Sequence, residues 1–164
     1  MAAGATYEPI ATTTLGAAQT SYTFTSISGS YTDLYLVIAG SGAVSGGNML
    51  LQFNSDTASN YSTTILFGDG SSAGSARASS ASSMNIGDLD ATTQSNTLVS
   101  IMNYSNTTTY KTALGRSNRS AVAVAAKVGL WRSTSAITSV KVFFSTADVF
   151  TSGTTLTLYG IAAA

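Results

Sequence analysis

Histidine and cysteine are both absent from the 164 residues of this chain. The chain therefore lacks the commonest general base, the commonest thiol nucleophile and most of the side chains that hold transition metals. Without cysteine it also has neither a disulfide framework nor a thiolate metal site. We expect no enzymatic activity, no catalytic residue and no cofactor.

Charge is scarce as well. Seven basic and seven acidic side chains give a net charge of zero, and the charged fraction of 9% is far below the usual quarter. Because Lys and Arg are not in excess, the composition predicts no positively charged surface that would attract the phosphates of a nucleic acid. We therefore expect no nucleic-acid partner. A near-neutral surface rich in Ser and Thr suits a protein that lives in an assembly, although it is equally consistent with a plain polar surface.

Long apolar runs are missing too. No stretch approaches the roughly 20 apolar residues of a membrane-spanning helix, so we expect a soluble protein with no membrane partner. The first residues, MAAGATYEPIATTTLG, have neither a basic region nor an apolar core, and no signal peptide is expected.

The residues that are present favour β structure. Val, Thr and aromatic residues alternate with small or polar ones in short segments that are separated by Gly, Ser and Asn. This pattern predicts an all-β fold, a jelly-roll-like or Greek-key sandwich of about ten strands. We expect residues 1–6 to form a flexible N-terminal arm and residues 7–164 to form one domain. The predicted strands are Tyr7–Leu15, Thr20–Ile27, Asp33–Ser41, Asn48–Asn54, Tyr61–Phe67, Met84–Leu89, Thr97–Tyr104, Tyr110–Arg116, Ser120–Trp131, Ala136–Phe144 and Thr154–Ile161.

Three segments carry more specific predictions. Ala136–Phe144 and Thr154–Ile161 flank a break with Ser152-Gly153, which predicts an antiparallel hairpin between them. Gly68–Ser83 contains mostly Gly, Ser and Ala, which predicts a long exposed loop that is either a contact loop or disordered. Ser120–Trp131 alternates Val with Ala, which predicts a strand with one bulky and one small face.

Candidate chemistry is sparse. Asp88 with Asp90, and Asn54 with Asp56, offer oxygens for calcium, but neither pair forms the dense ligand loop that calcium sites use. Most carboxylates stand beside turns, where Asp usually bonds its own backbone. Tyr61, Tyr104, Tyr110 and Trp131 are candidates for stacking on sugars, with Arg132 beside the tryptophan, although a tryptophan at a strand end is more often a core or interface anchor.

An ordered series of short motifs resembles a family. The chain is similar to small structural proteins of tailed bacteriophages, which are common among phages of cyanobacteria and other aquatic bacteria. The motifs are Tyr7-Glu8-Pro9-Ile10-Ala11, Tyr31-Thr32-Asp33-Leu34, Leu51-Gln52-Phe53-Asn54 with Asp56 and Asn60-Tyr61-Ser62, Ile86-Gly87-Asp88-Leu89, Asn103-Tyr104 with Tyr110-Lys111-Thr112, Gly129-Leu130-Trp131-Arg132-Ser133 with Ala136-Ile137, and Leu158-Tyr159-Gly160-Ile161.

The resemblance implies a non-enzymatic β-sandwich of the virion. Such proteins are capsid decoration (cement) proteins, often trimers at capsid symmetry axes, or parts of tails and fibres. Our first hypothesis is a homotrimeric decoration protein on the capsid surface, which bridges capsomers through strand edges, the Tyr7 arm and Gly68–Ser83. Its partners would be the major capsid protein or other virion proteins. The second hypothesis is a tail or fibre module that binds host glycans through aromatic side chains, and the third is a hydrolase that uses Asp88 and Asp90.

Overall fold

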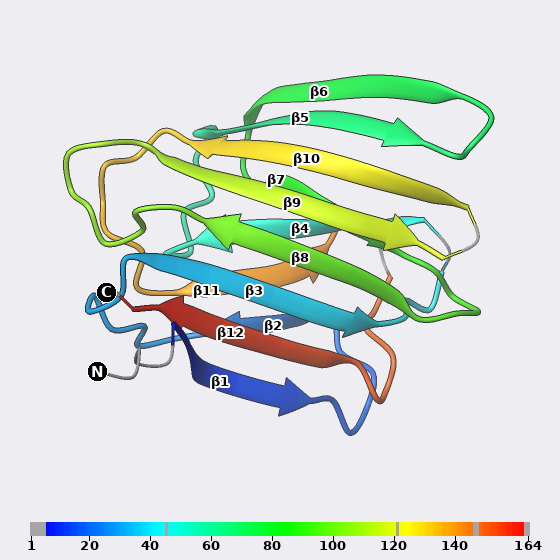
Figure 1. Cartoon of the computed structure of the whole chain (residues 1–164), viewed down its shortest axis with the longest axis horizontal. Helices are drawn as coiled ribbons and strands as arrows, with labels where there is room; N and C mark the ends of the chain where they lie inside the picture. The colour runs from blue at the N-terminus through cyan, green and yellow to red at the C-terminus, as the bar shows by residue number, and fades with distance from the viewer. Residues whose placement is uncertain (1–5, 45, 121, 146–147, 163–164) are drawn as a thin grey trace.

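The computed structural model describes residues 6–44, 46–120, 122–145 and 148–162 of the chain, and these residues form strands and turns without any helix. Two antiparallel sheets lie one behind the other (Figure 1). The prediction of a single all-β sandwich is therefore confirmed. The strands are β1 (Tyr7–Thr14), β2 (Ser21–Phe24), β3 (Asp33–Gly40), β4 (Gly47–Phe53), β5 (Tyr61–Gly68), β6 (Ala73–Ala81), β7 (Met84–Leu89), β8 (Ser95–Ile101), β9 (Lys111–Arg119), β10 (Ala123–Trp131), β11 (Val140–Phe144) and β12 (Thr155–Ile161).

The two sheets differ in size. The large sheet has the strand order β1-β12-β3-β8-β9-β10-β5-β6, and the small sheet has the order β2-β11-β4-β7. Because eight strands face four, the small sheet covers only part of the large one, and β6 has almost no buried side chain. No described residue belongs to a helix that is long and apolar enough to cross a membrane.

The core lies between the two sheets. On each covered strand every second side chain points inward, as the period of two in the sequence predicts. Leu34, Leu36 and Ile38 of β3, for example, are fully buried. The largest buried side chains gather where β4, β5 and β10 approach each other: Phe53, Tyr61 and Trp131.

The predicted C-terminal hairpin is wrong. β11 pairs with β2 and β4 in the small sheet, whereas β12 pairs with β1 and β3 in the large sheet. The chain between them crosses from one sheet to the other, and Phe150 on this crossing forms isolated bridges with Gln19 and Gly42. Alternation reveals that a strand has a face to bury, but it does not reveal which sheet that strand joins.

The predicted long loop Gly68–Ser83 is also wrong, because most of it is strand β6. Asp69 ends β5 in a tight turn, where its carboxylate accepts bonds from the backbone amides of Ser71 and Ser72. β6 then returns along β5 in an antiparallel ladder. Small, polar side chains do not predict such a strand, because the backbone ladder holds it in place and burial contributes little.

The predicted N-terminal arm, residues 1–6, lies outside the described residues except for Thr6. The carbonyl of Thr6 accepts a hydrogen bond from the amide of Ala162, 3.1 Å away, so this residue is held beside the end of β12.

Candidate functional site

β10 turns its bulkier face away from the core. Val124 and Val128 are 64% and 49% exposed on the outer surface of the large sheet, whereas Lys127 and Gly129 of the same strand face the small sheet and are buried. The inner face of β10 packs against β7. Lys127 reaches Asp88 of β7 there, and a Cβ atom on Gly129 would lie only 2.4 Å from the sulfur of Met84, so no side chain fits at Gly129.

Neighbouring strands extend these valines into an apolar surface. Leu66 of β5 lies opposite Ala126 in the ladder and is 60% exposed, and Leu114 of β9 lies opposite Val128 and is 52% exposed. We call this surface the outer patch, and its residues are Leu66, Leu98, Leu114, Val124, Ala126 and Val128.

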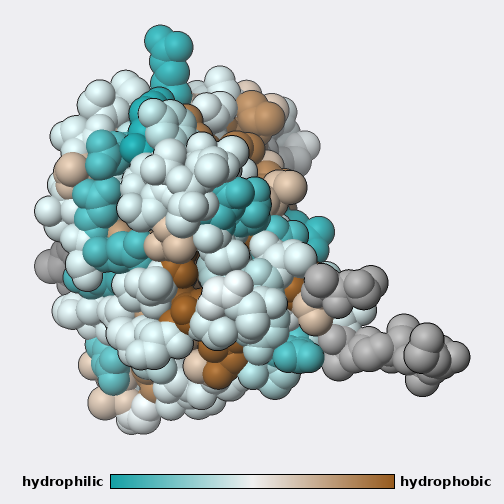
Figure 2. All heavy atoms as spheres, turned by 90° about the vertical axis from the view of Figure 1, so that its left-hand side faces the viewer, coloured by the Kyte–Doolittle hydropathy of each residue, from teal (hydrophilic) through white to brown (hydrophobic). Residues whose placement is uncertain are grey.

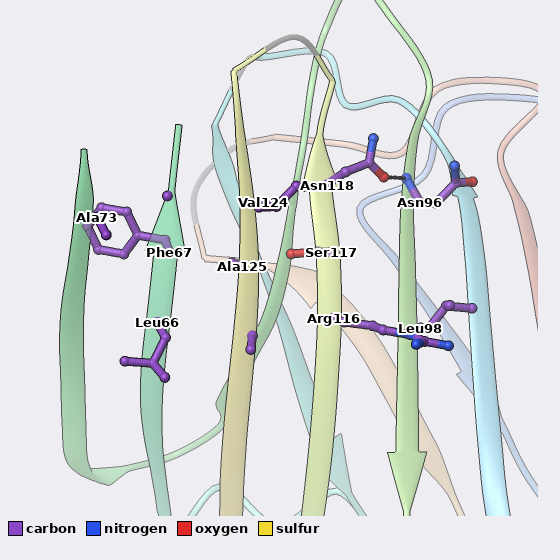
Figure 3. Close-up of a pocket in the computed structure, with 12 residues that line it drawn as sticks. Leu66, Phe67, Ala73, Asn96, Leu98, Arg116, Ser117, Asn118, Val124 and Ala125 are labelled. Carbon is purple, nitrogen blue, oxygen red and sulfur yellow. Dashed lines mark hydrogen bonds between the residues drawn. The ribbon is translucent and has the colours of Figure 1, made fainter. Parts of the chain in front are cut away.

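The outer patch is large enough to form a binding surface. Its four most exposed side chains, Leu66, Leu114, Val124 and Val128, are each 49–64% exposed, and with Leu98 and Ala126 they present an apolar area on the order of 400 Å². This is the size of the largest apolar patch on a typical monomer, and such patches are often functional. One part of the surface is hollowed to about 650 Å³, and Figure 3 shows Leu66, Val124, Arg116 and Leu98 along this hollow.

Arginines lie within and beside the outer patch. Arg116 lies in the row between Ala126 and Leu98, and its Nη2 donates a hydrogen bond to the hydroxyl of Tyr35, 3.1 Å away. Arg132 donates from Nη2 to the hydroxyl of Ser62, and Arg77 lies opposite Thr64 on the same outer face.

These three arginines form no ion pair within the described residues. The other cations of the large sheet are used inside the protein: Lys111 is buried, Lys127 pairs with Asp88 and Arg119 lies 3.7 Å from Asp90. Although the chain has no net charge, the part of the outer face around the outer patch is therefore basic, and Asp33 of β3 lies farther along the same face.

A second feature of this face is a group of tyrosine rings near its β1 margin. Tyr7 packs edge-to-face against Tyr35 and Tyr159, with ring centroids 5.9 Å and 6.4 Å apart. Tyr7 itself is 53% exposed. Of the aromatic side chains predicted as contacts, Tyr7 thus lies on the same face as the outer patch.

Three other predicted contacts lie in the core. Tyr61 and Trp131 are buried, and their rings stack with centroids 6.2 Å apart. The indole nitrogen of Trp131 donates to the Oδ2 of Asp56 at 2.7 Å, and the hydroxyl of Tyr61 accepts a bond from the amide of Phe53 at 3.0 Å. Burial raises the pKa of Tyr61 to about 12.

Tyr104 is buried too, and its hydroxyl donates to the carbonyl of Ser28 and accepts from the amide of Tyr31. These hydrogen bonds explain why a phenol or an indole stands at a core position: each polar atom of the ring has a partner. Tyr110 and Arg132 are exposed, and Arg132 lies at the end of β10 beside the outer face.

The scattered carboxylates have protein partners. Lys127 donates to Asp88 at 2.7 Å, and Asp90 accepts bonds from Thr92. Burial alone would raise the pKa of Asp56, but the bonds from Asn60, Trp131 and the amide of Ala58 outweigh it and hold the pKa below its ordinary value. Within the described ranges no three acidic side chains come together in a group that could hold a metal ion.

Burial also affects the two inner lysines. It lowers the pKa of Lys127, although Asp88 opposes the shift, and it lowers the pKa of Lys111, whose ammonium donates to the carbonyls of Thr109 and Thr134 at 2.7 and 3.3 Å. Both lysines stabilise internal structure and neither one faces an open surface.

Sequence reasoning missed the outer patch. The alternation of Val and Ala in β10 did show one bulky and one small face, and this signal marks the strand as unusual. The bulky face of a strand is normally buried, so the pattern alone points the valines inward. In the structure the opposite face of β10, with Lys127, Gly129 and Trp131, packs against β7 and the core, and the valines therefore point outward.

No family model matches the sequence, and no curated protein matches it either. Among solved structures, an alginate lyase is 12% identical, with 92% of this chain and 77% of the lyase covered and a TM-score of 0.35. A protein of unknown function from Shewanella oneidensis MR-1 is 8% identical, with 85% of this chain and 62% of that chain covered and a TM-score of 0.21. Both likenesses are too weak to carry an argument about this protein.

Proposed function

We propose that this chain is a non-enzymatic structural protein of a tailed-phage virion, a capsid decoration protein that docks on the major capsid protein or another virion protein through its outer patch. The observation that carries the proposal is the outward valine face of β10. Val124 and Val128 stand on a rigid central strand, where an exposed aliphatic row is unfavourable unless something covers it.

One patch alone binds weakly. Leu66, Leu114, Val124 and Val128 each expose about half of their surface, and covering them stabilises a complex by about 1 kcal/mol each. A total near 4 kcal/mol corresponds to a Kd of roughly 1 mM before the cost of association is counted. A homotrimer engages three such patches at once, and avidity turns weak contacts into stable attachment. We therefore retain the homotrimer as part of the proposal.

Two experiments test this function. The first labels the C-terminus and images intact virions: label spread over the head supports a decoration protein, and label confined to the tail refutes it. The second measures binding to phage shells that lack the protein. Leu114→Asn should weaken binding at least tenfold, whereas Val44→Asn, which changes a side chain that is 59% exposed outside the outer patch, should bind normally. Equal binding by both variants would contradict the outer patch as the docking surface.

A tail or fibre module that binds host glycans is the second candidate. The tyrosine group of Tyr7, Tyr35 and Tyr159 favours it, because aromatic faces stack on sugar rings and Arg116 beside Tyr35 can donate hydrogen bonds to sugar oxygens. A glycan array probed with the purified protein tests this candidate. Binding that Tyr7→Ala removes would support it, and an array without any binding would exclude it.

A further inference from the structure

The two sheets have four edge strands, β1, β6, β2 and β7. An edge strand exposes backbone N–H and C=O groups that can pair with another chain, so proteins usually protect their edges. β1 contains Pro9, which has no N–H, and its register is irregular between Pro9 and Ala11. β2 is only four residues long. Both of these edges are therefore poor templates for pairing.

The edge at β7 is closed by side chains. The amide of Asn85 donates to the hydroxyl of Thr63 at 3.1 Å, and the amide of Gly87 donates to the Oδ1 of Asn85 at 3.2 Å. These two N–H groups lie on the side of β7 away from β4, and because they are already bonded they do not offer a free ladder to another strand.

β6 has these protections only near its end, where its register with β5 shifts between Ala78 and Ala81, and its ladder from Ala73 to Ala78 is regular. It is nine residues long, it contains no proline, and its side chains are nearly all exposed. Figure 1 shows it at the upper margin of the large sheet, with β5 as its neighbour on one side and no strand on the other. Arg77 is its one charged residue, and the rest of the strand consists of Ala, Gly and Ser.

The turn before β6 shows which backbone groups point outward. The amide of Asp69 donates to the carbonyl of Ser72, so these two residues form a hydrogen-bonded pair. Bonded and non-bonded pairs alternate along an antiparallel ladder. Residues 74, 76 and 78 therefore point their N–H and C=O groups toward β5, and Ala73, Ser75 and Arg77 point theirs toward the free edge.

The same alternation holds elsewhere in the large sheet. Continued from β5 through β10 to β9, it predicts that Thr112 points its backbone groups toward β8. The carbonyl of Thr112 does accept a hydrogen bond from the amide of Met102, at the end of β8. The assignment of the outward groups of β6 is therefore consistent across three strands.

We propose that two copies of this chain pair antiparallel through β6, about a two-fold axis at Ser75, and join their large sheets into one. In this register Ser75 lies opposite the partner's Ser75, and Ala73 lies opposite the partner's Arg77. All three outward residues of each strand then take part in hydrogen-bonded pairs. Registers shifted along the strand leave at least one of them without a counterpart.

Charge and side-chain size favour a second copy as the occupant. The axis at Ser75 sets each Arg77 against an alanine and separates the two arginines by about 14 Å along the strands, which is beyond the screening length of about 8 Å at physiological salt. An axis at Arg77 would place the two cations directly opposite each other. The small side chains of β6 meet their own copies without a clash.

This contact is independent of the proposed function. It uses the edge of the large sheet and leaves the outer patch uncovered, so two patches would face the same way from one continuous sheet. A homotrimer through other surfaces and a two-fold contact through β6 can coexist, in which case β6 links neighbouring trimers. Failure of shell binding would not affect the β6 contact, and failure of pairing would not affect shell binding.

The absence of cysteine from the chain makes a direct test available. In the proposed dimer the two Ser75 residues form a hydrogen-bonded pair with Cα atoms about 5.5 Å apart, which is within disulfide range. Ser75→Cys should therefore form a disulfide-linked dimer under oxidised glutathione at least about tenfold faster than Ser71→Cys, a control in the exposed turn beside β6. Equal rates for both variants, or no dimer with Ser75→Cys, would overturn the proposal.

Sedimentation velocity of the cysteine-free protein provides a second readout. The average mass should rise with increasing concentration toward twice that of the unit that pairs, which is a monomer or, where the homotrimer forms, a trimer. Ser75→Pro removes an outward N–H but no bond to β5, so it should keep the fold and abolish the dimer, whereas Ser75→Thr keeps the N–H and should keep the dimer. A dimer that survives Ser75→Pro in a variant with native circular dichroism would show that β6 is not the contact.

Discussion

The indole of Trp131 offers the sharpest test of how the core is held together. The sequence made this residue a candidate for ligand contact, but it is buried against Phe53 and Tyr61 and donates to Asp56 at 2.7 Å. We expect Trp131→Phe to destabilise the fold and to leave surface binding unchanged. The reasoning fails if the variant loses binding at full stability.

The expected destabilisation of Trp131→Phe is the sum of a lost hydrogen bond and a lost buried volume. A hydrogen bond to a charged acceptor contributes about 1.5–3 kcal/mol, and because Asp56 is half-exposed we take the lower end of that range. Replacing indole with benzyl also removes roughly 40 Å³ from a buried position, which costs about 1 kcal/mol at about 24 cal/mol per Å³. The sum is about 2.5 kcal/mol, which for a chain of this length lowers Tm by roughly 5–10 °C.

Calorimetry is the suitable assay, because Trp131 is the only tryptophan and its fluorescence disappears in the variant. A double-mutant cycle with Asp56→Ala, which removes the acceptor, isolates the bond between the two side chains, and we expect a coupling energy of about 1–2 kcal/mol. A coupling below about 0.3 kcal/mol, or a Tm within about 2 °C of wild type, would refute the assigned role of this hydrogen bond.

Three further predictions concern the core. Gly129→Ala should lower the free energy of unfolding by about 1–3 kcal/mol in a urea titration, because the new methyl group would lie 2.4 Å from the sulfur of Met84. Asp88→Asn should destabilise more than Lys127→Met in the same titration, because it leaves a buried ammonium without its carboxylate, whereas the methionine removes the charge. Stability should fall as pH rises from about 10 to 12, because the pKa of Tyr61 is raised to about 12 in the folded protein and the unfolded chain releases that proton first.

Each of these predictions has a control. Gly16→Ala adds a methyl group where no atom lies within 4 Å, so its stability should be close to that of the wild type. Tyr61→Phe should make the loss of stability between pH 10 and 12 shallower, and an unchanged slope would assign that loss to other groups. If Lys127→Met proves the more damaging change of the two, the ion pair with Asp88 contributes more than its desolvation costs.

At acidic pH the stability of the fold changes in the opposite direction, because the pKa of Asp56 is lowered and not raised. The pKa of Asp56 is held below its ordinary value of 3.8, so the carboxylate contributes stability above that value and loses its contribution as pH falls through the lowered pKa. The Asp56→Asn variant should therefore lose less stability than the wild type between pH 5 and pH 2.

The sequence predicted the strands well because their signal is local. In β3 the inward residues Leu34, Leu36 and Ile38 recur at every second position, and such a pattern is complete within one segment. The turn residues between segments are local as well. Eleven of the twelve strands therefore overlap a segment that the sequence identifies, with boundary differences of a few residues.

The pairing of the strands and the exposure of their faces follow only from the tertiary structure. β6 has no apolar period, and its pairing with β5 depends on backbone groups that every residue type carries. β11 and β12 are close in sequence but lie in different sheets, because the crossing at Phe150 links the two layers. No local pattern distinguishes these arrangements from a loop or a hairpin.

What the sequence by itself determined is the absence of histidine and cysteine and the β class of the fold, because both depend on which residues are present and on their spacing along the chain. Only the tertiary structure decided which side chains are accessible. Trp131 and Tyr61 lie inside because their polar atoms find partners at Asp56 and Phe53. The valines of β10 lie outside because the opposite face of the strand, with Lys127, Gly129 and Trp131, packs against β7 and the core. Exposure is a property of the packed sheets, and the proposed docking surface therefore follows from packing and not from composition.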